Sequence, residues 1–240
     1  MQWLILEPEL AALQFSSPFI KDTAVALTAI ADHHSSLVGS EISESKAMGA
    51  ARQYSFSSGR HCVRQIQAAL GMQPGAIERR ERAPIWPKDC VGSISHSSEI
   101  ALAALSRSLT GIGADIERQG RVTRKIWSKL FTQEEVSWLK SAPDFCADLI
   151  FSAKEAGYKA IYPLGQRFIG FHEAQIELDL PRQQFRIKYL GSHKPNAPLD
   201  VGVGYWHRAQ DHVLTCLLYT SPSPRDTPIS NAPLSGVRLL

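Results

Sequence analysis

Residues 111–117 read Gly-Ile-Gly-Ala-Asp-Ile-Glu, a glycine-punctuated apolar run that contains two carboxylates. Such a run predicts a β-strand, and successive side chains of a strand point to opposite faces. Because Asp115 and Glu117 are two positions apart, we expect both on the same face of this strand. Their oxygens can then converge on one point.

A second segment, residues 151–160, reads Phe-Ser-Ala-Lys-Glu-Ala-Gly-Tyr-Lys-Ala and predicts a helix. The i,i+4 spacing puts Glu155 and Lys159 on one helix face. The two segments together offer three carboxylates, the ligands that Mg2+ takes along with water and substrate phosphate. Their lysines suit a polyanionic ligand. A surface salt-bridge network is the alternative for either segment alone.

A third block precedes both segments: residues 84–97 read Pro-Ile-Trp-Pro-Lys-Asp-Cys-Val-Gly-Ser-Ile-Ser-His-Ser. Upstream of it lies Gly59-Arg60-x(3)-Arg64. In this order, the blocks resemble the 4'-phosphopantetheinyl transferases, specifically the monomeric branch with the surfactin-type and enterobactin-type enzymes. The enterobactin synthase component D type is the most similar pattern. The resemblance covers residues 45–215, and the ordered set is specific although no single block is.

The resemblance implies an α+β fold of two similar halves related by pseudo-twofold symmetry, with coenzyme A bound in the cleft between them. We expect the N-terminal half to span residues 1–108 and the C-terminal half, with the metal site, to span residues 109–215. The resemblance also implies a monomer that transfers the 4'-phosphopantetheine group of coenzyme A to a serine of an apo carrier protein. Mg2+ would be the cofactor and coenzyme A the co-substrate.

Individual residues acquire roles from the same resemblance. Mg2+ ligation falls on Asp115, Glu117 and Glu155. Glu155 is also a candidate general base toward the serine, so its role stays open between ligand and base. The catalytic candidates are Glu155 and Lys159. The candidates for binding coenzyme A are mainly basic side chains that suit phosphate, namely Arg52, Arg60, Arg64, Arg82, Ser95, His96, Lys154 and Lys159. A solvated helix face is the alternative for the arginines and lysines on helices, and a structural role is the alternative for His96.

Composition narrows the class of protein. The chain has 240 residues, 44% of them hydrophobic and 20% charged, with a formal net charge of +3, as in ordinary globular proteins. No apolar run approaches the roughly 18 residues that span a bilayer, and the first residues lack a basic signal-peptide region. The four cysteines show neither CxxC nor zinc spacing, which favours a reducing cytoplasm. The basic residues are dispersed, which disfavours nucleic-acid binding.

Helix and strand patterns occur in both halves, as expected for an α+β protein. The expected helices cover residues 44–70, a segment opened by a capping box at Thr132-Gln133-Glu134-Glu135, and residues 145–161. Residues 1–40 give a weak strand-like start and an apolar stretch near residues 24–30. The expected strands are residues 92–95, 100–105, 110–117, 174–180, 185–189, 202–206 and 212–215.

The C-terminal residues need separate treatment. Residues 216–226 read Cys-Leu-Leu-Tyr-Thr-Ser-Pro-Ser-Pro-Arg-Asp, which resembles the translation of a transposase-type sequencing-library adapter. We therefore expect the authentic sequence to stop near Thr215 and residues 216–240 to form a non-native tail outside the fold. An ordinary Ser/Pro-rich tail is the alternative.

Two other functions stay open on sequence grounds: a coenzyme A-binding protein without transfer activity, and a metal-dependent phosphohydrolase built on the same carboxylates. The intact set of Asp115, Glu117, Glu155 and Lys159 favours the transferase. The enterobactin-type spacing favours a carrier partner in siderophore or nonribosomal peptide synthesis over a polyketide or fatty-acid carrier. A mildly basic cleft would steer an acidic carrier toward the site.

Overall fold

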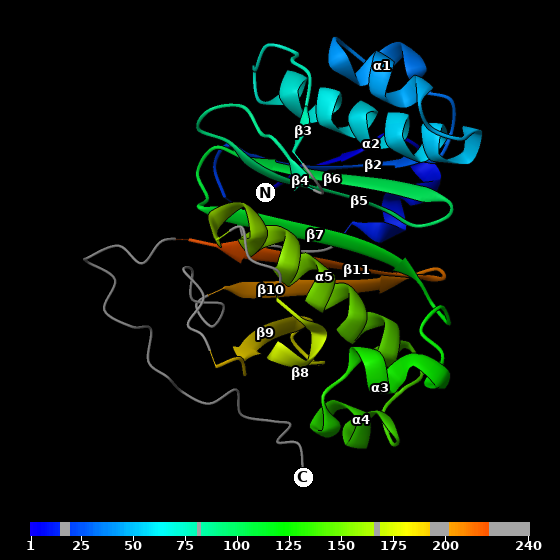
Figure 1. Cartoon of the computed structure of the whole chain (residues 1–240), viewed down its shortest axis with the longest axis vertical. Coiled ribbons are helices and arrows are strands. Elements are labelled where there is room, and N and C mark those ends of the chain that lie inside the picture. The colour runs from blue at the N-terminus through cyan, green and yellow to red at the C-terminus, as the bar shows by residue number, and fades with distance from the viewer. Residues whose placement is uncertain (15–19, 81–82, 166–168, 193–201, 221–240) are drawn as a thin grey trace.

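Two large β-sheets, each with one long helix against a face, form the body of this computed structural model, and a separate two-stranded sheet is added to them (Figure 1). It describes residues 1–14, 20–80, 83–165, 169–192 and 202–220. The helices are α1 (Ser40–Lys46), α2 (Ala50–Ala69), α3 (Trp127–Leu130), α4 (Gln133–Leu139) and α5 (Phe145–Gly165). The strands are β1 (Gln2–Ile5), β2 (Thr23–Ala29), β3 (Arg79–Arg80), β4 (Ala83–Pro84), β5 (Val91–His96), β6 (Ile100–Ser106), β7 (Gly111–Arg118), β8 (Ala174–Asp179), β9 (Gln184–Tyr189), β10 (Val203–Ala209) and β11 (His212–Tyr219).

The first sheet has the strand order β1-β2-β6-β5 and the second has β7-β11-β10-β9-β8. Strands β5 and β6, which match the expected strands at residues 92–95 and 100–105, pair antiparallel. The predicted capping box opens α4, because the Thr132 hydroxyl accepts from the Glu135 amide and the Glu135 carboxylate accepts from the Thr132 amide. The expected α+β class is confirmed. No helix in the described ranges combines the length and apolarity that a membrane crossing requires.

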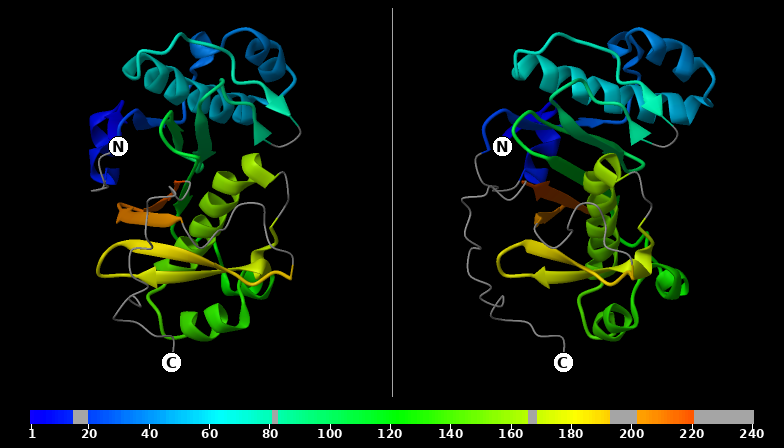
Figure 2. Two further views of the ribbon diagram at one scale, coloured as in Figure 1. Left: turned by 90° about the vertical axis from the view of Figure 1, so that its left-hand side faces the viewer. Right: turned by 60° about the vertical axis from the view of Figure 1, so that its left-hand side comes forward.

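Strand alternation divides the buried side chains between two environments. One set packs beneath α2 and includes Ala24, Ala26, Ala101, Ala103 and Leu105. The opposite faces of the two sheets share a second core, which includes Val25, Leu27, Leu102, Ile112, Ile116, Leu214 and Leu218. The 3-10 helix η1 (Pro8–Leu13) packs into this shared core, and the N-terminal segment lies on the side away from α5 (Figure 2). A third core fills the space between α5 and the second sheet.

Strands β5 and β7 lie side by side where the two sheets meet (Figure 1). The Ser93 hydroxyl donates to the Ala114 carbonyl at 3.1 Å and accepts from the Ala114 amide at 3.0 Å. One side chain therefore satisfies a backbone donor and a backbone acceptor of the neighbouring sheet. This contact fixes β5 beside the strand that carries Asp115.

Helix α5 approaches β7 closely because two glycines lie beneath it. A Cβ atom on Gly113 would fall 1.8 Å from the Ala156 carbonyl oxygen, and one on Gly111 would fall 2.7 Å from that of Ala160. Contacts this short exclude any side chain at these two positions. The same alternating face continues to Asp115, which is thereby brought up to α5.

Two predicted helices differ from the structure in their bounds. The expected helix over residues 44–70 is divided into α1 and α2, with Gly49 as the N-cap of α2. Glycine is a poor residue within a helix and a tolerated one at its start, which explains the division. Helix α5 continues past Pro163, where the sequence predicted an end, and finishes at Gly165.

The expected end of the fold at Thr215 is wrong. Strand β11 runs on to Tyr219, paired with β7 along its whole length and with β10 along most of it. Residues 216–219 are at most 6% exposed. The reason is composition: Cys-Leu-Leu-Tyr is apolar and continues the strand, whereas the Ser/Pro-rich residues begin only at Ser221. Residues 221–240 lie outside the described part of the chain.

Candidate functional site

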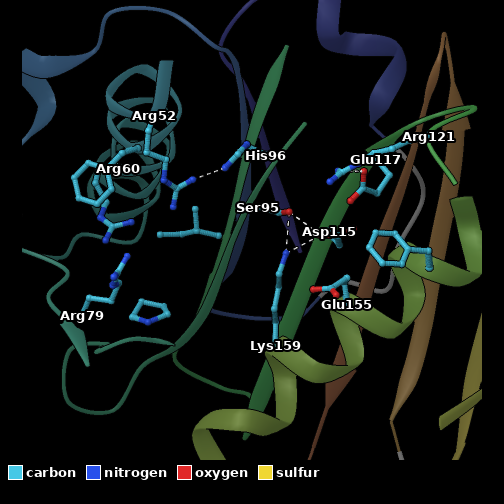
Figure 3. A pocket seen from close by; sticks show the side chains of 14 residues that line it. Arg52, Arg60, Arg79, Ser95, His96, Asp115, Glu117, Arg121, Glu155 and Lys159 are labelled. Atoms are coloured by element: carbon cyan, nitrogen blue, oxygen red, sulfur yellow. Dashed lines mark hydrogen bonds and ion pairs between the residues drawn. The ribbon is translucent and has the colours of Figure 1, made fainter. Parts of the chain in front are cut away.

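A pocket of about 390 Å3 lies between the two halves (Figure 3). One wall comes from α2, β3 and β5, and the other comes from β7 and α5. Carboxylates gather on the second wall, and three of the four lining arginines lie on the first. The lining residues are Arg52, Phe56, Arg60, Arg79, Pro84, Ile94, Ser95, His96, Asp115, Glu117, Arg121, Phe151, Glu155 and Lys159.

Asp115 is the buried centre of the acidic wall. Its Oδ1 accepts from Lys159 Nζ at 2.6 Å and from the Ser95 hydroxyl at 2.7 Å, and Lys159 also donates to Ser95 Oγ at 2.8 Å. Asp115 Oδ2 is buried and has no hydrogen-bond partner among the described residues. A buried carboxylate oxygen without a partner costs free energy, so this atom has capacity for a ligand.

Glu117 and Glu155 carry raised pKa values. Burial, followed by the neighbouring charge of Asp115, raises the pKa of Glu117 to about 7, although its ion pair with Arg121 opposes the rise. Burial also raises the pKa of Glu155, against the attraction of Lys159. Within the described ranges, Glu155 makes neither a hydrogen bond nor an ion pair. The positive charge near Asp115, Glu117 and Glu155 is therefore too small to offset their burial and mutual repulsion.

A divalent cation fits this arrangement. In the described part of the chain, no group of three or more His, Cys, Asp and Glu side chains is arranged so that it could hold a metal ion. Mg2+ seldom needs such a group, since it is usually held by one or two carboxylates together with water and substrate phosphates. The unpartnered oxygen of Asp115 and the raised pKa values of Glu117 and Glu155 are what such an open site requires.

At the opposite end of the pocket, His96 contacts Arg52. The Arg52 guanidinium donates to His96 Nε2 at 2.7 Å, and His96 Nδ1 lies 3.0 Å from the Ser97 carbonyl oxygen. Burial lowers the pKa of His96. The imidazole is therefore neutral, with its proton on Nδ1, and it holds Arg52 in place by accepting at Nε2.

Two more arginines complete the basic wall. Arg60 donates to the Ile77 carbonyl at 3.2 Å and lies over the Phe56 ring at 4.3 Å. Arg79, from β3, lies 3.6 Å from Glu44 and is half-exposed. These guanidinium groups face the pocket with room for an anionic ligand (Figure 3).

Two residues predicted to bind coenzyme A lie outside the pocket lining. Arg64 donates to Glu41 at 2.6 Å and to Gln67 at 2.8 Å behind α2. Lys154 donates to Glu135, to the Leu130 carbonyl and to the Phe171 carbonyl. All three protons of this ammonium group are used, which argues against a phosphate contact. Arg82 lies outside the described residues.

The structure adds Arg79 and Arg121, which sequence reasoning missed. The Arg79-Arg80 pair is a weak signal, because its position beside the pocket depends on the β3–β4 ribbon. Arg121 lies four residues beyond Glu117, but it follows the end of a strand, where that spacing predicts no contact. Neither residue could be assigned without the tertiary structure.

The pocket thus combines a wall rich in arginines with a cluster of carboxylates. Residues 41–106 match the 4'-phosphopantetheinyl transferase N-terminal domain, and residues 111–217 match the 4'-phosphopantetheinyl transferase superfamily. The chain belongs to the 4'-phosphopantetheinyl transferase superfamily.

Individual relatives agree with this assignment. The chain is 33% identical to the 4'-phosphopantetheinyl transferase Npt of Nocardia iowensis, over 70% of this chain and 82% of that protein. It is 31% identical to the 4'-phosphopantetheinyl transferase Svp of Streptomyces mobaraensis, over 72% and 74%. It is also 34% identical to enterobactin synthase component D of Salmonella austin, over 42% of each chain.

Proposed function

We propose that this enzyme transfers the 4'-phosphopantetheine group of coenzyme A to a serine of an apo carrier protein, with Mg2+ bound at Asp115, Glu117 and Glu155. One observation carries the proposal. A single pocket joins a carboxylate cluster with unfilled ligand capacity to a wall of three arginines. Coenzyme A has a pyrophosphate and a separate 3'-phosphate, and these two anionic groups match the two ends of the pocket.

The reaction would form a bond between the serine Oγ and the β-phosphorus and break the bond from that phosphorus to the leaving 3',5'-adenosine bisphosphate. Mg2+, when bound, would neutralise charge on the pyrophosphate. Lys159 is placed to add a second positive charge there, because it is anchored on Asp115 and reaches the pocket. Phosphoryl transfer depends mainly on such positioning and charge neutralisation.

Glu155 is the candidate to take the serine proton, directly or through water. Its pKa is raised by burial, and no described residue pairs with its carboxylate. A carboxylate with a raised pKa is a better proton acceptor near neutral pH than an ordinary one. The same features suit a metal ligand, and a water shared with the cation would let Glu155 act in both ways.

Arg52, Arg60 and Arg79, with His96, would hold the 3'-phosphate and adenylate end. Arginine forks bind phosphate oxygens in pairs. His96 would act partly through Arg52, whose guanidinium it already holds. Ser95 would act at the other end, since its hydroxyl lies between Lys159 and Asp115.

We further propose a carrier protein of siderophore or nonribosomal peptide synthesis as the partner, and a cytoplasmic monomer that does not bind nucleic acid. The similarity to enterobactin synthase component D supports the first part. The free state of all four cysteines is compatible with a reducing compartment.

Mass spectrometry of an apo carrier incubated with coenzyme A and Mg2+ tests the proposal. We expect the carrier to gain one phosphopantetheine group, and we expect EDTA to prevent the gain. A panel of peptidyl, aryl and fatty-acid apo carriers then tests the partner class by comparing rates. A phosphohydrolase would release phosphate without a carrier, and an inactive binding protein would bind coenzyme A without modifying any carrier; either result would contradict the proposal.

A further inference from the structure

Arg121 holds a carboxylate that the proposed function assigns to the metal. Its Nη1 donates to Glu117 Oε2 at 2.5 Å. Glu117 is 7% exposed, whereas Arg121 is 60% exposed and approaches from the loop that follows β7. In Figure 3 the Arg121 side chain reaches Glu117 at the edge of the pocket.

Two other cations of the pocket, Lys159 and Arg60, are held more firmly. Lys159 has two polar side-chain partners, and Arg60 is buried against a carbonyl and an aromatic ring. The ion pair with Glu117 is the polar contact that the structure gives to Arg121 among the described residues. An ion pair with one partner in water contributes little to stability, so it can be exchanged at low cost.

A divalent cation and the Arg121 guanidinium would compete for the negative charge of Glu117 and, at Oε2, for the same oxygen. Asp115 offers the cation only its second oxygen, because the first is already taken by Lys159 and Ser95. A cation that binds Glu117 through Oε2, or through both oxygens, therefore releases Arg121. The guanidinium borders the pocket in the paired state, because Arg121 is part of its lining, so a ligand in the pocket is within its surroundings.

We propose that Arg121 is a displaceable counter-ion of the metal site: it neutralises Glu117 before the cation binds, yields that carboxylate to the cation, and then donates to phosphate oxygens of the ligand. This inference rests on the proposed Mg2+ site. The planar fork of arginine suits both partners, since it binds carboxylate and phosphate with the same geometry. Rotation of an exposed side chain is sufficient for the exchange, and no backbone movement is needed.

The exchange would couple the two ligands. Mg2+ frees Arg121 for the phosphates, and coenzyme A draws Arg121 away from Glu117, so each ligand strengthens the binding of the other. Such coupling is reciprocal by thermodynamic necessity. Arg121 would thereby favour joint binding of metal and nucleotide over binding of the metal alone.

Calorimetric titration of the purified full chain with Mg2+ at a fixed pH tests the first step. We expect Arg121→Gln to bind Mg2+ alone about fivefold more tightly than wild type, because the competitor is gone. Arg124→Gln is the matched control: it removes the same charge from the same segment, and its side chain lies over Trp127 at 5.4 Å, outside the pocket lining. An Arg121→Gln affinity equal to or below that of Arg124→Gln would overturn the inference. Circular dichroism checks that both variants are folded.

The second step is tested by repeating the titration with saturating coenzyme A. The factor by which coenzyme A tightens Mg2+ binding should fall about fivefold in Arg121→Gln and stay at the wild-type value in Arg124→Gln. An unchanged factor in Arg121→Gln would overturn the hand-over to phosphate. Asp115→Asn distinguishes a failure of the proposed metal site from a failure of the role given to Arg121. If Asp115→Asn binds Mg2+ as well as wild type, the proposed metal site fails and this inference fails with it. Loss of Mg2+ binding in Asp115→Asn with an unaltered Arg121→Gln would overturn the inference alone.

Discussion

Two buried carboxylates in this molecule differ in how completely they are satisfied. Behind α2, Glu41 accepts from Arg64 at 2.6 Å and from the backbone amides of Ile77 and Val38 at 2.7 and 3.0 Å. In the pocket, Asp115 uses one oxygen for Lys159 and Ser95 and leaves the other without a partner among the described residues. The first group is complete and structural, whereas the second retains capacity that only a ligand can fill.

The same contrast occurs along one helix. Lys154 and Lys159 both lie on α5, but the Lys154 side chain is 2% exposed and the Lys159 side chain is 24% exposed. Lys154 donates to the Glu135 carboxylate, which also caps α4 and accepts from the Ile176 amide. Lys159 instead reaches the pocket. A charged group with all its bonds made inside the protein supports the fold, and one that still faces a cavity can serve a ligand.

The largest effect is expected from removing the end of β11, because β11 pairs with β7, the strand that carries Asp115 and Glu117. A chain that ends at Thr215 loses residues 216–219 of β11, and the packing of Leu217 and Leu218 alone contributes about 2–5 kcal/mol each. This approaches the total stability of an ordinary domain. We expect that chain to be unfolded by circular dichroism, while a chain that ends at Thr220 keeps all of β11 and folds. Equal melting temperatures for the two chains would contradict the assignment of residues 216–219 to the core.

Asp115→Ala should abolish transfer without unfolding the protein. We expect carrier modification to slow by about 1000-fold or more, because the change removes a preorganised charge at the reacting phosphate. Stability should change little, since Asp115 already has an unsatisfied oxygen. Glu117→Ala should behave alike. Robust Mg2+-dependent transfer by Asp115→Ala would refute the metal assignment.

Glu41→Gln should show the reverse pattern. Removing this charge leaves Arg60 and Arg64 buried without their counter-ion, which costs about 3 kcal/mol of unfolding free energy. Chemical denaturation measures the loss. Transfer by the fraction that remains folded should be close to wild type, apart from an effect through Arg60. A stable Glu41→Gln protein with no transfer activity would contradict the structural role that we assign to Glu41.

His96→Ala should weaken coenzyme A binding more than it slows the chemical step. We expect KM to rise about tenfold, since the loss frees Arg52 and removes a contact distant from the transferred group. Arg52→Gln should have a similar effect, because the two residues act as a unit. Kinetics with coenzyme A and its 3'-dephospho form provide the measurement. If His96→Ala still discriminates between them as strongly as wild type, the proposed 3'-phosphate contact is incorrect.

The smallest effect concerns pH. The pKa of Glu117 is raised to about 7, so its carboxyl group is protonated below that value and a cation must displace the proton. Mg2+ affinity should therefore be several-fold higher at pH 8 than at pH 6. The metal-free protein should lose stability as pH rises through this window, because the unfolded chain has already released that proton. The increase in melting temperature caused by Mg2+ should thus be larger at pH 8. Glu117→Gln should remove most of this pH dependence, and an unchanged dependence would assign it to another group.

The sequence alone determined the features that depend on local geometry. Alternation along residues 111–117 predicts Asp115 and Glu117 on one face, and the glycines of the same face permit the close approach of α5. The capping box at Thr132 is equally local, since both of its hydrogen bonds span three residues. The ordered motifs were sufficient for the family, because they combine three separate local patterns.

Only the tertiary structure decided which charged groups serve the pocket. Arg60 and Arg64 lie on the same face of α2, yet only Arg60 is part of the pocket lining. Arg64 donates to Glu41, which lies 23 residues away in the chain. Lys154 forms an ion pair with Glu135 in the same way, and the pocket receives Arg121 from the loop after β7 and Arg79 from the β3–β4 ribbon. The extension of β11 also depends on two distant partner strands. Partners far apart in sequence meet only after the chain has folded, so periodicity specifies the face on which a side chain lies but not the group that it meets there.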